Sequence, residues 1–296
     1  MKRNILNTAL VLTAGVLWGV TGIFVRALSA EGFGAIQIVF IRLFASLPPF
    51  AVLILCKDRK NGFRIRLRDL PLFLGLGIGS ILFFTVCYFT AMRETSLSTA
   101  AVLLYTSPIW VMLASVFLFK NPFTLRKGTA LALSFIGCVL VSGWGKVSVK
   151  GLLAGLGAGL GYAAYSILAT VALKRYPPHT ITFYTFLIAT VGALPMSDPV
   201  GTVSRIAASP HTGRLLLLFA AAGIVIVFLP YLCYTSGLRA VPADTAAILT
   251  TVEPLVATLV GVAVFHETLT FSGVFGIFCI LSAIVVLHAK KRSVHE

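Results

Sequence analysis

Apolar residues gather into ten long runs along this chain, and short polar or charged stretches separate the runs. Each run is 18 to 26 residues long, close to the ~20 residues with which a helix crosses the hydrocarbon core of a bilayer. The strict alternation of apolar and polar positions that marks a membrane β-barrel is absent from the sequence, so helices are the predicted spanning elements. The expected spans cover residues 5–27, 33–56, 70–92, 96–119, 125–144, 151–173, 179–196, 213–238, 241–265 and 269–288.

Composition also indicates that a bilayer is the solvent of this chain. Of its 296 residues, 58% are hydrophobic and 11% are charged, and the mean hydropathy is +0.99. A soluble domain of that composition would expose too much apolar surface. The formal charge of +15 does not indicate nucleic-acid binding, because the basic residues lie between the apolar runs and form no continuous patch. The first run is longer than the apolar part of a secretory signal, so we expect it to be retained as a span.

Lysine and arginine residues fall mainly on one side of the predicted bundle. With ten spans, 17 of the 24 basic residues share the side of the N-terminus, six lie on the other side, and Arg42 lies within a span. Cytoplasmic loops of membrane proteins carry such an excess of basic residues. We therefore expect a multi-pass protein of the cytoplasmic membrane, with its N- and C-termini both in the cytoplasm.

The two halves of the sequence resemble each other. A shift of 146 positions places residues 87–124 over residues 233–270 without a gap, and 11 of the 38 pairs are identical. The third and fourth spans therefore correspond to the eighth and ninth, which gives two units of five spans. Because five is odd, the second unit must enter the membrane from the opposite side, as in many secondary transporters. The predicted fold is all-α, with ten transmembrane helices in two inverted five-helix repeats, residues 1–145 and 146–296, around a central cavity.

Pro108 and Pro254 occupy equivalent places near the middle of the fourth and ninth spans. Each proline lacks an amide donor and displaces the hydrogen bond to the carbonyl four residues earlier, at Leu104 or Thr250. Interrupted helices at equivalent depth in two repeats are typical of a midplane binding site in a transporter. Proline is also common in membrane helices for structural reasons alone, and the sequence leaves this alternative open.

Arg42 in the second span and Glu253 in the ninth are charges deep within apolar runs. A charge at the bilayer centre costs at least about 2.5 kcal/mol, so both side chains should face the interior of the bundle or a wet cavity. At the rise of an α-helix they lie about 15 and 18 Å from opposite surfaces, close to one depth. Three roles compete: Arg42 could bind a carboxylate or phosphate of a substrate, Glu253 could carry a proton or bind an amine, or the two could pair as a structural lock.

Aromatic residues with polar groups occupy the same levels of the predicted bundle. Tyrosine and tryptophan can line a cavity while offering a hydrogen bond or a ring face for a cation. The alternative is packing between helices or anchoring at the membrane interface. The predicted substrate-binding residues are Trp18, Arg42, Tyr88, Tyr105, Tyr165, Tyr234 and Glu253, with helix breaks at Pro108 and Pro254.

Short motifs in both halves carry a resemblance to a known family. They are Leu17-Trp18-Gly19 with Arg26, Arg42, Tyr105-Thr106-Ser107-Pro108, Val252-Glu253-Pro254 and His266-Glu267-Thr268-Leu269-Thr270. In these motifs and their order, the whole chain resembles the ten-span drug/metabolite transporter superfamily, EamA type. It departs from the family pattern at Asn121, where the family often has glutamate. The resemblance implies a central cavity between the repeats, alternating access, and often export of amino acids, metabolites or drugs, commonly coupled to protons.

We therefore predict a secondary transporter that moves a small metabolite, such as an amino acid, an amine or a drug-like solute, across the cytoplasmic membrane by alternating access. Export is the predicted direction, and proton coupling, which the sequence leaves open, would use Glu253. The expected partners are the solute, the lipid bilayer and, with coupling, protons; nucleic acid is not expected. A monomer and a homodimer both stay open, and no cofactor or metal is expected.

Two other functional classes fit the sequence less well. A membrane-embedded enzyme needs a nucleophile with a base, or a metal cluster, at one depth. The sequence has no GxxxxGK[ST], HExxH or GxSxG motif, and its five cysteines have no CxxC spacing. We therefore predict that the chain is not an enzyme. A passive channel or a lipid-translocating protein is the main alternative to a carrier.

Overall fold

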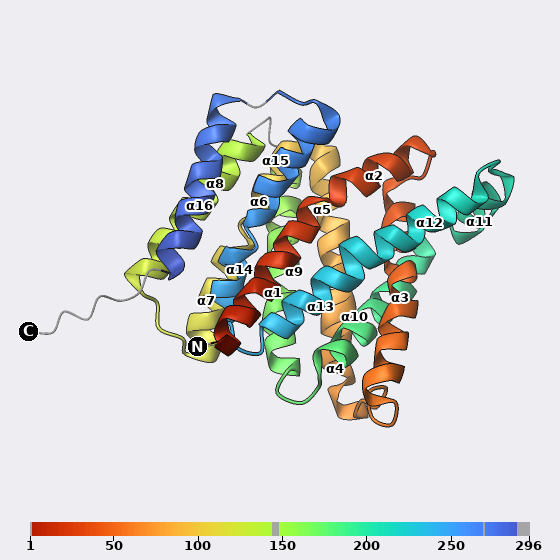
Figure 1. Cartoon of the computed structure of the whole chain (residues 1–296), viewed down its shortest axis with the longest axis horizontal. Coiled ribbons are helices and arrows are strands. Elements are labelled where there is room, and N and C mark those ends of the chain that lie inside the picture. Colours follow the sequence, from red (N-terminus) through yellow and green to blue (C-terminus); the bar gives the residue numbers. More distant parts are fainter. Residues whose placement is uncertain (1, 144–147, 269, 289–296) are drawn as a thin grey trace, which may run out of the picture.

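The chain folds into a bundle of membrane-crossing helices. The computed structural model describes residues 2–143, 148–268 and 270–288, and every regular element within those ranges is a helix (Figure 1). The prediction of an all-α protein is therefore confirmed. The predicted boundary between the repeats, after residue 145, lies outside the described residues.

Five crossings make up the first half of the chain. They are formed by α1 (Lys2–Gly19) with α2 (Thr21–Ala30); α3 (Ala35–Asp58); η1 (Leu67–Asp69), α4 (Leu70–Leu74), η2 (Gly75–Leu82) and α5 (Phe83–Glu94); α6 (Leu97–Leu104) with α7 (Ser107–Phe119); and α8 (Leu125–Ser142).

Five further crossings make up the second half, in which the short helix α11 (Pro199–Ala208) precedes the eighth crossing. They are formed by α9 (Val149–Ala172); α10 (Pro178–Ala193) with η3 (Leu194–Met196); α12 (Thr212–Gly223), η4 (Ile224–Phe228) and α13 (Leu229–Gly237); α14 (Ala243–Leu249) with α15 (Val252–Phe265); and α16 (Phe271–His288).

Nine of these crossings, within the part of the chain that the structure describes, are long and apolar enough to span a membrane. The tenth, α16, is apolar over the shorter stretch Phe271–Leu287 and packs closely against α8 (Figure 1). The ten predicted spans are thus all present as helices.

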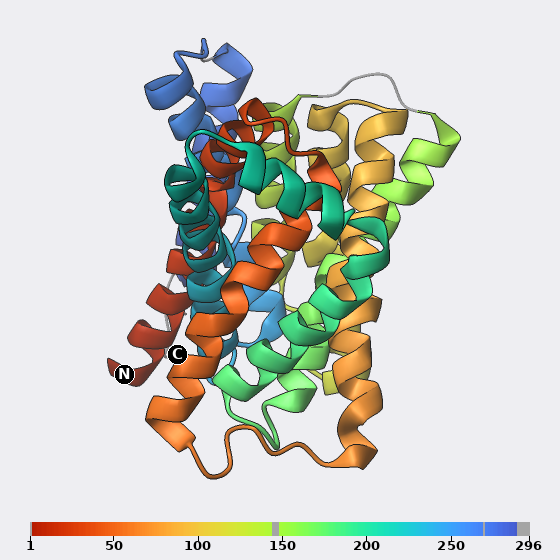
Figure 2. The same cartoon turned by 90° about the vertical axis from the view of Figure 1, so that its right-hand side faces the viewer.

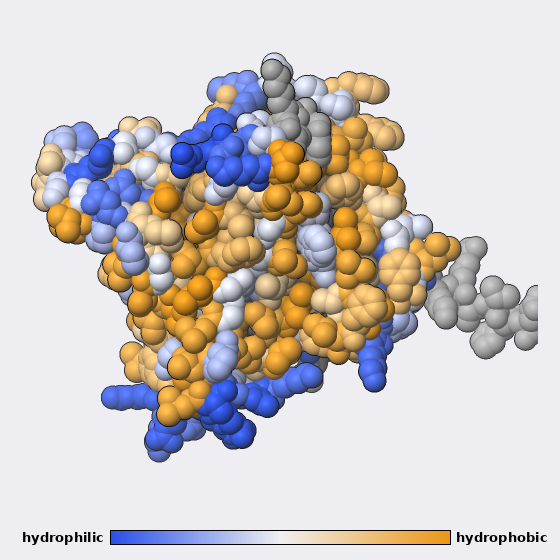
Figure 3. Space-filling model, turned by 180° about the vertical axis from the view of Figure 1, so that it is seen from behind, coloured by the Kyte–Doolittle hydropathy of each residue, from blue (hydrophilic) through white to orange (hydrophobic). Residues whose placement is uncertain are grey.

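Polar residues gather at the two ends of the bundle. On the face that Figure 3 shows, a broad apolar band lies between hydrophilic residues at the upper and lower ends. We call the end at which α1 begins the terminal face, and the end at which α2 is followed by α3 the opposite face. Since the number of crossings is even, α16 also ends at the terminal face.

Backbone details recur at equivalent places in the two halves. Lys120 and His266, which end α7 and α15, both adopt the left-handed conformation, with φ of 53° and 54°. Thr124 and Thr270 then accept hydrogen bonds from amides three residues ahead and cap the next helix. Both pairs are separated by the shift of 146 that aligns the sequence halves. The π-helical segments η2 and η4 also lie in equivalent crossings, the third of each half.

The second repeat is inverted relative to the first. The first crossing runs from the terminal face to the opposite face, whereas the sixth, formed by α9, runs in the reverse direction. The prediction of two inverted five-helix repeats is therefore confirmed.

The two repeats exchange their first helices. α1 packs against α13 and α15, whereas α9 packs against α5 and α7. Glycines permit this close approach: a Cβ on Gly15 would lie 2.6 Å from Cγ1 of Val252, and one on Gly159 would lie 2.5 Å from Oγ1 of Thr106. The core of the bundle therefore consists of a first group, α1, α13 and α15, and a second group, α9, α5 and α7. Each group combines helices of both repeats.

The second and seventh crossings lie beside each other on one flank of this core. α3 packs against both α10 and α12 (Figure 2). Phe50 of α3 stacks on Phe186 of α10 with 5.7 Å between ring centroids. This contact joins α3, the helix that carries Arg42, to α10.

The fourth and ninth crossings are interrupted inside the membrane. Two residues separate the end of α6 from the start of α7, and two residues separate the end of α14 from the start of α15. Pro108 and Pro254 lie in the first turn of the resuming helix, where a missing amide leaves no helical hydrogen bond unmade. The hydroxyls of Thr106 and Thr251 donate to carbonyls three residues earlier, at 2.7 and 2.6 Å. The same two carbonyls also accept from the backbone amides of Thr106 and Thr251, both at 3.2 Å, so equivalent turns form at the two interruptions.

Candidate functional site

A cavity of about 540 Å³ lies in the middle of the bundle, between the two groups. Its lining extends to the opposite face at Arg26, Met92, Ser142 and Glu267, whereas no described residue of the terminal face lines it. The cavity is therefore open to the opposite face and closed toward the terminal face. Its volume lies within the range of sites for small organic molecules.

The structure brings most of the predicted site residues together. Those that line the cavity are Trp18, Arg42, Tyr88, Tyr105, Glu253 and Pro254. Tyr165 and Tyr234 lie deeper, at a small pocket of about 10 Å³ that Trp18 also lines. Pro108 is buried in α7 and lines neither cavity.

Arg42 lies in the wall of the cavity on α3. Its Nε atom is buried without a hydrogen-bond partner, and its guanidinium is in none of the ion pairs among the described residues. A guanidinium stays charged at any physiological pH. The cavity therefore contains an unpaired positive charge within the membrane.

Glu253 lies in the first turn of α15, where the interrupted ninth crossing resumes. The amide dipoles at a helix N-terminus favour a negative charge at this place. Its carboxylate lines the cavity and has no hydrogen-bond or ion-pair partner among the described residues. Arg42 and Glu253 thus face one cavity without pairing, which excludes the structural lock between them in this conformation.

Tyrosine side chains lie around these two charges. Tyr88 of α5 and Tyr231 of α13 are each close enough to interact electrostatically with both Arg42 and Glu253. Tyr88 belongs to the second group and Tyr231 to the first. Both groups of helices therefore contribute a tyrosine that lies near both charged side chains.

Tyr231 and Tyr162 line the cavity but were not among the predicted site residues. Tyr162 lies within electrostatic range of Glu253, and its hydroxyl is buried without a partner. Tyr231 precedes Tyr234 by three positions, so both lie on one side of α13. That spacing was the signal in the sequence from which Tyr231 could have been identified.

An aromatic floor, formed by Trp18, Tyr162, Tyr165, Tyr231 and Tyr234, closes the cavity toward the terminal face. Trp18 contacts Tyr231, Tyr234 and Tyr162, with centroid distances of 5.0, 5.5 and 5.9 Å. Tyr165 meets Tyr231 edge to face at 5.0 Å. These residues come from α1, α9 and α13, so the aromatic floor joins the two groups.

Hydrogen bonds at the aromatic floor connect α9 with α13. The hydroxyls of Tyr165 and Thr235 are 2.7 Å apart, and those of Ser166 and Tyr234 are 2.6 Å apart. All four side chains are buried. The second group is therefore tied to the first group at this level.

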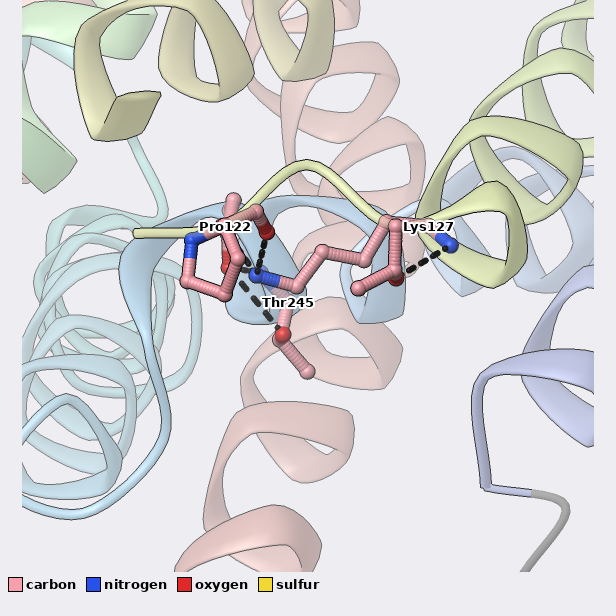
Figure 4. A network of polar contacts seen from close by, with 5 residues as sticks. Pro122, Lys127 and Thr245 are labelled. Carbon is pink, nitrogen blue, oxygen red and sulfur yellow. Dashed lines mark hydrogen bonds and ion pairs between the residues drawn. The ribbon is translucent and has the colours of Figure 1, made fainter. Parts of the chain in front are cut away.

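An ion pair between Lys127 and Asp244 lies below the aromatic floor, at the terminal face. Nζ of Lys127, at the start of α8, lies 2.7 Å from Oδ2 of Asp244, at the start of α14. The side chains are 16% and 1% exposed. The amide of Thr245 donates to the other oxygen of Asp244 at 2.6 Å, and Figure 4 shows Lys127 and Thr245 as members of this polar network. The pair connects the first repeat with the second.

A second polar contact at the terminal face joins η1 to the loop between α9 and α10. Arg175 forms an ion pair with Asp69, and the hydroxyl of Tyr176 donates to the same carboxylate at 2.6 Å. Burial raises the pKa of the Tyr176 hydroxyl, so it remains a donor at physiological pH.

The mouth of the cavity at the opposite face has a different arrangement. Arg26 forms an ion pair with Glu267 and lies 4.0 Å from the centre of the Phe265 ring. Both charged side chains are about half exposed, at 54% and 50%. Arg26 lies in α2, which continues the crossing of α1, and Glu267 follows α15. This contact therefore stays on the side of the first group and leaves the mouth open.

The two faces therefore differ although the repeats are equivalent. At the terminal face, α14 packs against α7. The corresponding elements at the opposite face, α6 and α15, make at most marginal contact. The helices therefore close the cavity at the terminal face and leave it open at the opposite face.

Comparisons with known proteins agree with this architecture. The model of the EamA-like transporter family matches the chain twice, over residues 7–143 and 149–288. A protein of Archaeoglobus fulgidus described as an uncharacterized transporter is 31% identical over 95% of both chains. The uncharacterized transporter YwfM of Bacillus subtilis is 27% identical over 99% of this chain and 96% of its own. One crystal structure shares the fold with a TM-score of 0.78 at 18% identity, covering 95% of this chain and 96% of the other.

Proposed function

Because the chain belongs to the EamA-like transporter family, we propose that it is a secondary transporter that carries a small organic solute through its central cavity by alternating access. Its membrane-transporter character follows from the family; the solute, the direction and the mechanism are our proposal. The solute would bind among Trp18, Arg42, Tyr88, Tyr105 and Glu253, with Tyr165 and Tyr234 closing the cavity below it.

One observation carries this proposal: the cavity lies between two helix groups that are joined at the terminal face and apart at the opposite face. An enclosed solute can change sides when such groups separate at one face and meet at the other. A channel would need a continuous path, whereas the aromatic floor and its hydrogen bonds close this one. We infer that the moving bodies are the first and second groups, because helix exchange ties the repeats 1–145 and 146–296 together.

We further propose that the terminal face is cytoplasmic, since 17 of the 24 basic residues lie on its side of the sequence topology. This conformation then opens away from the cytoplasm, and export releases the solute through the mouth near Arg26. Glu253 is a carboxyl group in the deep part of the cavity lining, so it is the group at which a proton could couple to transport.

Cross-linking across the aromatic floor tests alternating access for any solute that the protein carries. In a background without cysteines, Tyr165→Cys with Thr235→Cys would be joined by a short, reductively cleavable bifunctional thiol reagent. Solutes that bind the protein would be identified in a thermal-shift screen of amino acids, amines, nucleotides and drugs. Exchange of a binding solute across the membrane would then be measured in proteoliposomes. We expect the cross-link to stop exchange and its reductive cleavage to restore it.

The matched control joins helices of one group only. Glu94→Cys and Lys150→Cys replace an ion pair between α5 and α9, both in the second group, at 2.7 Å. Cross-linking there should leave exchange intact. Exchange that continues through the Tyr165–Thr235 cross-link would exclude alternating access across this floor.

A further inference from the structure

A basic segment, residues 57–68, joins α3 to the third crossing at the terminal face. Six of its residues are lysine or arginine: Lys57, Arg59, Lys60, Arg64, Arg66 and Arg68. All six are exposed, and none of them is in an ion pair within the part of the chain that the structure describes. Asp58, the one acidic residue of the basic segment, accepts a hydrogen bond from the amide of Asn61 at 3.2 Å. The basic segment therefore presents uncompensated positive charge beside the membrane.

The inner side of the basic segment is bound to the seventh crossing and to the loop before it. The hydroxyl of Thr180 donates to the carbonyl of Gly62 at 2.7 Å, and the amide of Arg66 donates to the hydroxyl of Tyr176 at 3.0 Å. The basic segment runs along the terminal face between α3 and α4 (Figure 2). A backbone held in this way loses little conformational freedom when its outer side binds a partner.

The third crossing begins within the basic segment, at Leu67. Exposed residues at this end of the crossing form an apolar stripe, which consists of Leu67, Leu70, Leu74 and Ile78. Their spacing of three and four positions places them on one side of the helix. Asp69 and Phe73 are buried on the other side. Since exposed apolar side chains of a membrane span contact the acyl chains of lipids, the apolar stripe marks where the hydrocarbon layer begins.

Arginine side chains flank the start of the apolar stripe. Arg66 and Arg68 are the direct neighbours of Leu67, and Arg64 lies two positions before Arg66. Their guanidinium groups therefore lie at the level of the lipid headgroups, where a guanidinium can bind a phosphate through two parallel hydrogen bonds. Asp69, the nearest acidic residue in the sequence, forms its ion pair on the inner side. The three arginines thus stay available to an anionic headgroup.

We propose that the basic segment and the apolar stripe together bind an anionic phospholipid, whose phosphate lies against Arg64, Arg66 and Arg68 and whose acyl chain follows the stripe. An anionic headgroup compensates the exposed arginines, and each basic residue near the membrane surface adds to the attraction. The apolar stripe favours a lipid over a soluble phosphate compound, because an acyl chain covers apolar surface. The bound lipid contacts the folded basic segment, so its binding stabilises the folded protein.

Three probes test this inference on the purified full-length protein in a nonionic detergent. Dioleoyl phosphatidylglycerol has an anionic headgroup, dioleoyl phosphatidylcholine has the same chains without a net charge, and glycerol 3-phosphate has the phosphate without chains. Binding would be titrated by native mass spectrometry, and the melting temperature would be measured with each probe. We expect phosphatidylglycerol to bind at least about tenfold more tightly than the other two and to raise the melting temperature most.

Two triple variants separate this site from the general positive charge of the terminal face. The segment variant combines Arg64→Gln, Arg66→Gln and Arg68→Gln. The control variant removes the same charge from other places of that face and combines Lys120→Gln, Arg126→Gln and Arg239→Gln. The segment variant should bind phosphatidylglycerol on the order of 100-fold more weakly than the wild type, because three attractions are lost. The control variant should retain nearly the wild-type affinity.

Two leucines test the apolar stripe in the same way. Leu67 is 86% exposed, and Leu125, at the start of α8 on the same face, is 83% exposed. Leu67→Asn should weaken the binding of phosphatidylglycerol about tenfold, since an apolar contact with the acyl chain is lost. Leu125→Asn is the matched control and should leave the affinity unchanged.

Several results would overturn the inference. They are equal affinities for phosphatidylglycerol and phosphatidylcholine, equal losses in the segment variant and the control variant, and binding of glycerol 3-phosphate as tight as that of phosphatidylglycerol. If the segment variant fails to fold, replacement of the same three arginines by lysine keeps the charge and should keep most of the affinity, and loss of lipid binding in that folded protein would assign the binding to guanidinium geometry instead of charge attraction, against the inference. No solute is used in these experiments, so the transport proposal is tested separately.

Discussion

Removing the charge of Lys127 should open the terminal face. In the structure, Asp244 is buried, and its carboxylate is held by Lys127 and by the amide and hydroxyl of Thr245. Lys127→Gln removes the positive partner and leaves the carboxylate in place. The substitution therefore raises the free energy of the conformation with a closed terminal face, because Asp244 is buried in that conformation.

The size of this penalty follows from burial. Loss of one partner of a buried ion pair costs about 3–5 kcal/mol, and the lower end, about 3 kcal/mol, applies here because Lys127 is partly exposed and Thr245 still donates. With ~1.4 kcal/mol for each factor of ten, the equilibrium should shift about 100-fold toward conformations with an open terminal face. Adding Asp244→Asn removes the unpaired charge and should reverse most of the shift.

A buried cysteine reports the shift. Ala169 of α9 has no exposed surface and lies toward the terminal end of its helix. Ala169→Cys, in a cysteine-free background, would be labelled from the terminal face by a membrane-impermeant maleimide. We expect faster labelling in Lys127→Gln than in the parent protein.

The ion pair between Lys150 and Glu94 supplies the control. Its N–O distance is also 2.7 Å, but its side chains are 71% and 32% exposed. Such pairs contribute less than about 1 kcal/mol, so Lys150→Gln should leave the labelling rate nearly unchanged. If the maleimide labels Ala169→Cys at the same rate in Lys127→Gln and in Lys150→Gln, the ion pair between Lys127 and Asp244 does not hold the terminal face closed.

Three further predictions follow from the packing and the site. Gly137→Ala would place a Cβ 2.8 Å from the Gly276 carbonyl oxygen and should force α8 and α16 apart, lowering the stability by about 1–3 kcal/mol; Gly79→Ala, with no atom within 4 Å, is the control, and equal melting temperatures would contradict the packing argument. Glu253→Gln should abolish the pH dependence of exchange in proteoliposomes, and a fully pH-responsive variant would remove Glu253 as the proton site. Phe89 is the equivalent of Thr235 under the shift of 146, and Thr21 is the equivalent of Tyr165 when Gly15 is aligned with Gly159. Thr21→Cys and Phe89→Cys should cross-link more readily in Lys127→Gln, because the opposite face closes when the terminal face opens; an unchanged rate would contradict that coupling.

The spans, their number and the inverted repeats were predictable because they depend on local patterns. A run such as residues 213–238 is apolar enough to cross the bilayer whatever its neighbours are, and the result is the continuous crossing of α12, η4 and α13. The repeat follows from sequence identity alone. Lys120 and His266 differ in type, yet the shift of 146 already placed them as equivalents, and both adopt the left-handed conformation that ends a helix.

Side-chain partners across the bundle were not predictable in this way. Lys127 and Asp244 are 117 positions apart, and the exchange of α1 and α9 between the repeats determines which distant helices meet. Tyr231 lines the cavity because of the orientation of α13 about its own axis. The apolar pattern does not determine that orientation, because α13 has polar residues on several sides. Arg42 and Glu253 were identifiable from the sequence because a charged side chain in a membrane span must face the interior of the bundle or a water-filled cavity.

The ion pair that joins the two repeats at the terminal face lies at positions where the repeats differ. Under the shift of 146, Asp244 corresponds to Ser98, and Lys127 corresponds to Gly273, so the buried ion pair has no counterpart at the opposite face. Because the fold consists of two inverted copies of one unit, each repeat can adopt the arrangement of the other. This gives two conformations, one open to each face. Their relative free energies then depend on such unequal positions. A serine and a glycine cannot form an ion pair, which accounts for a structure in which the terminal face is closed and the opposite face is open.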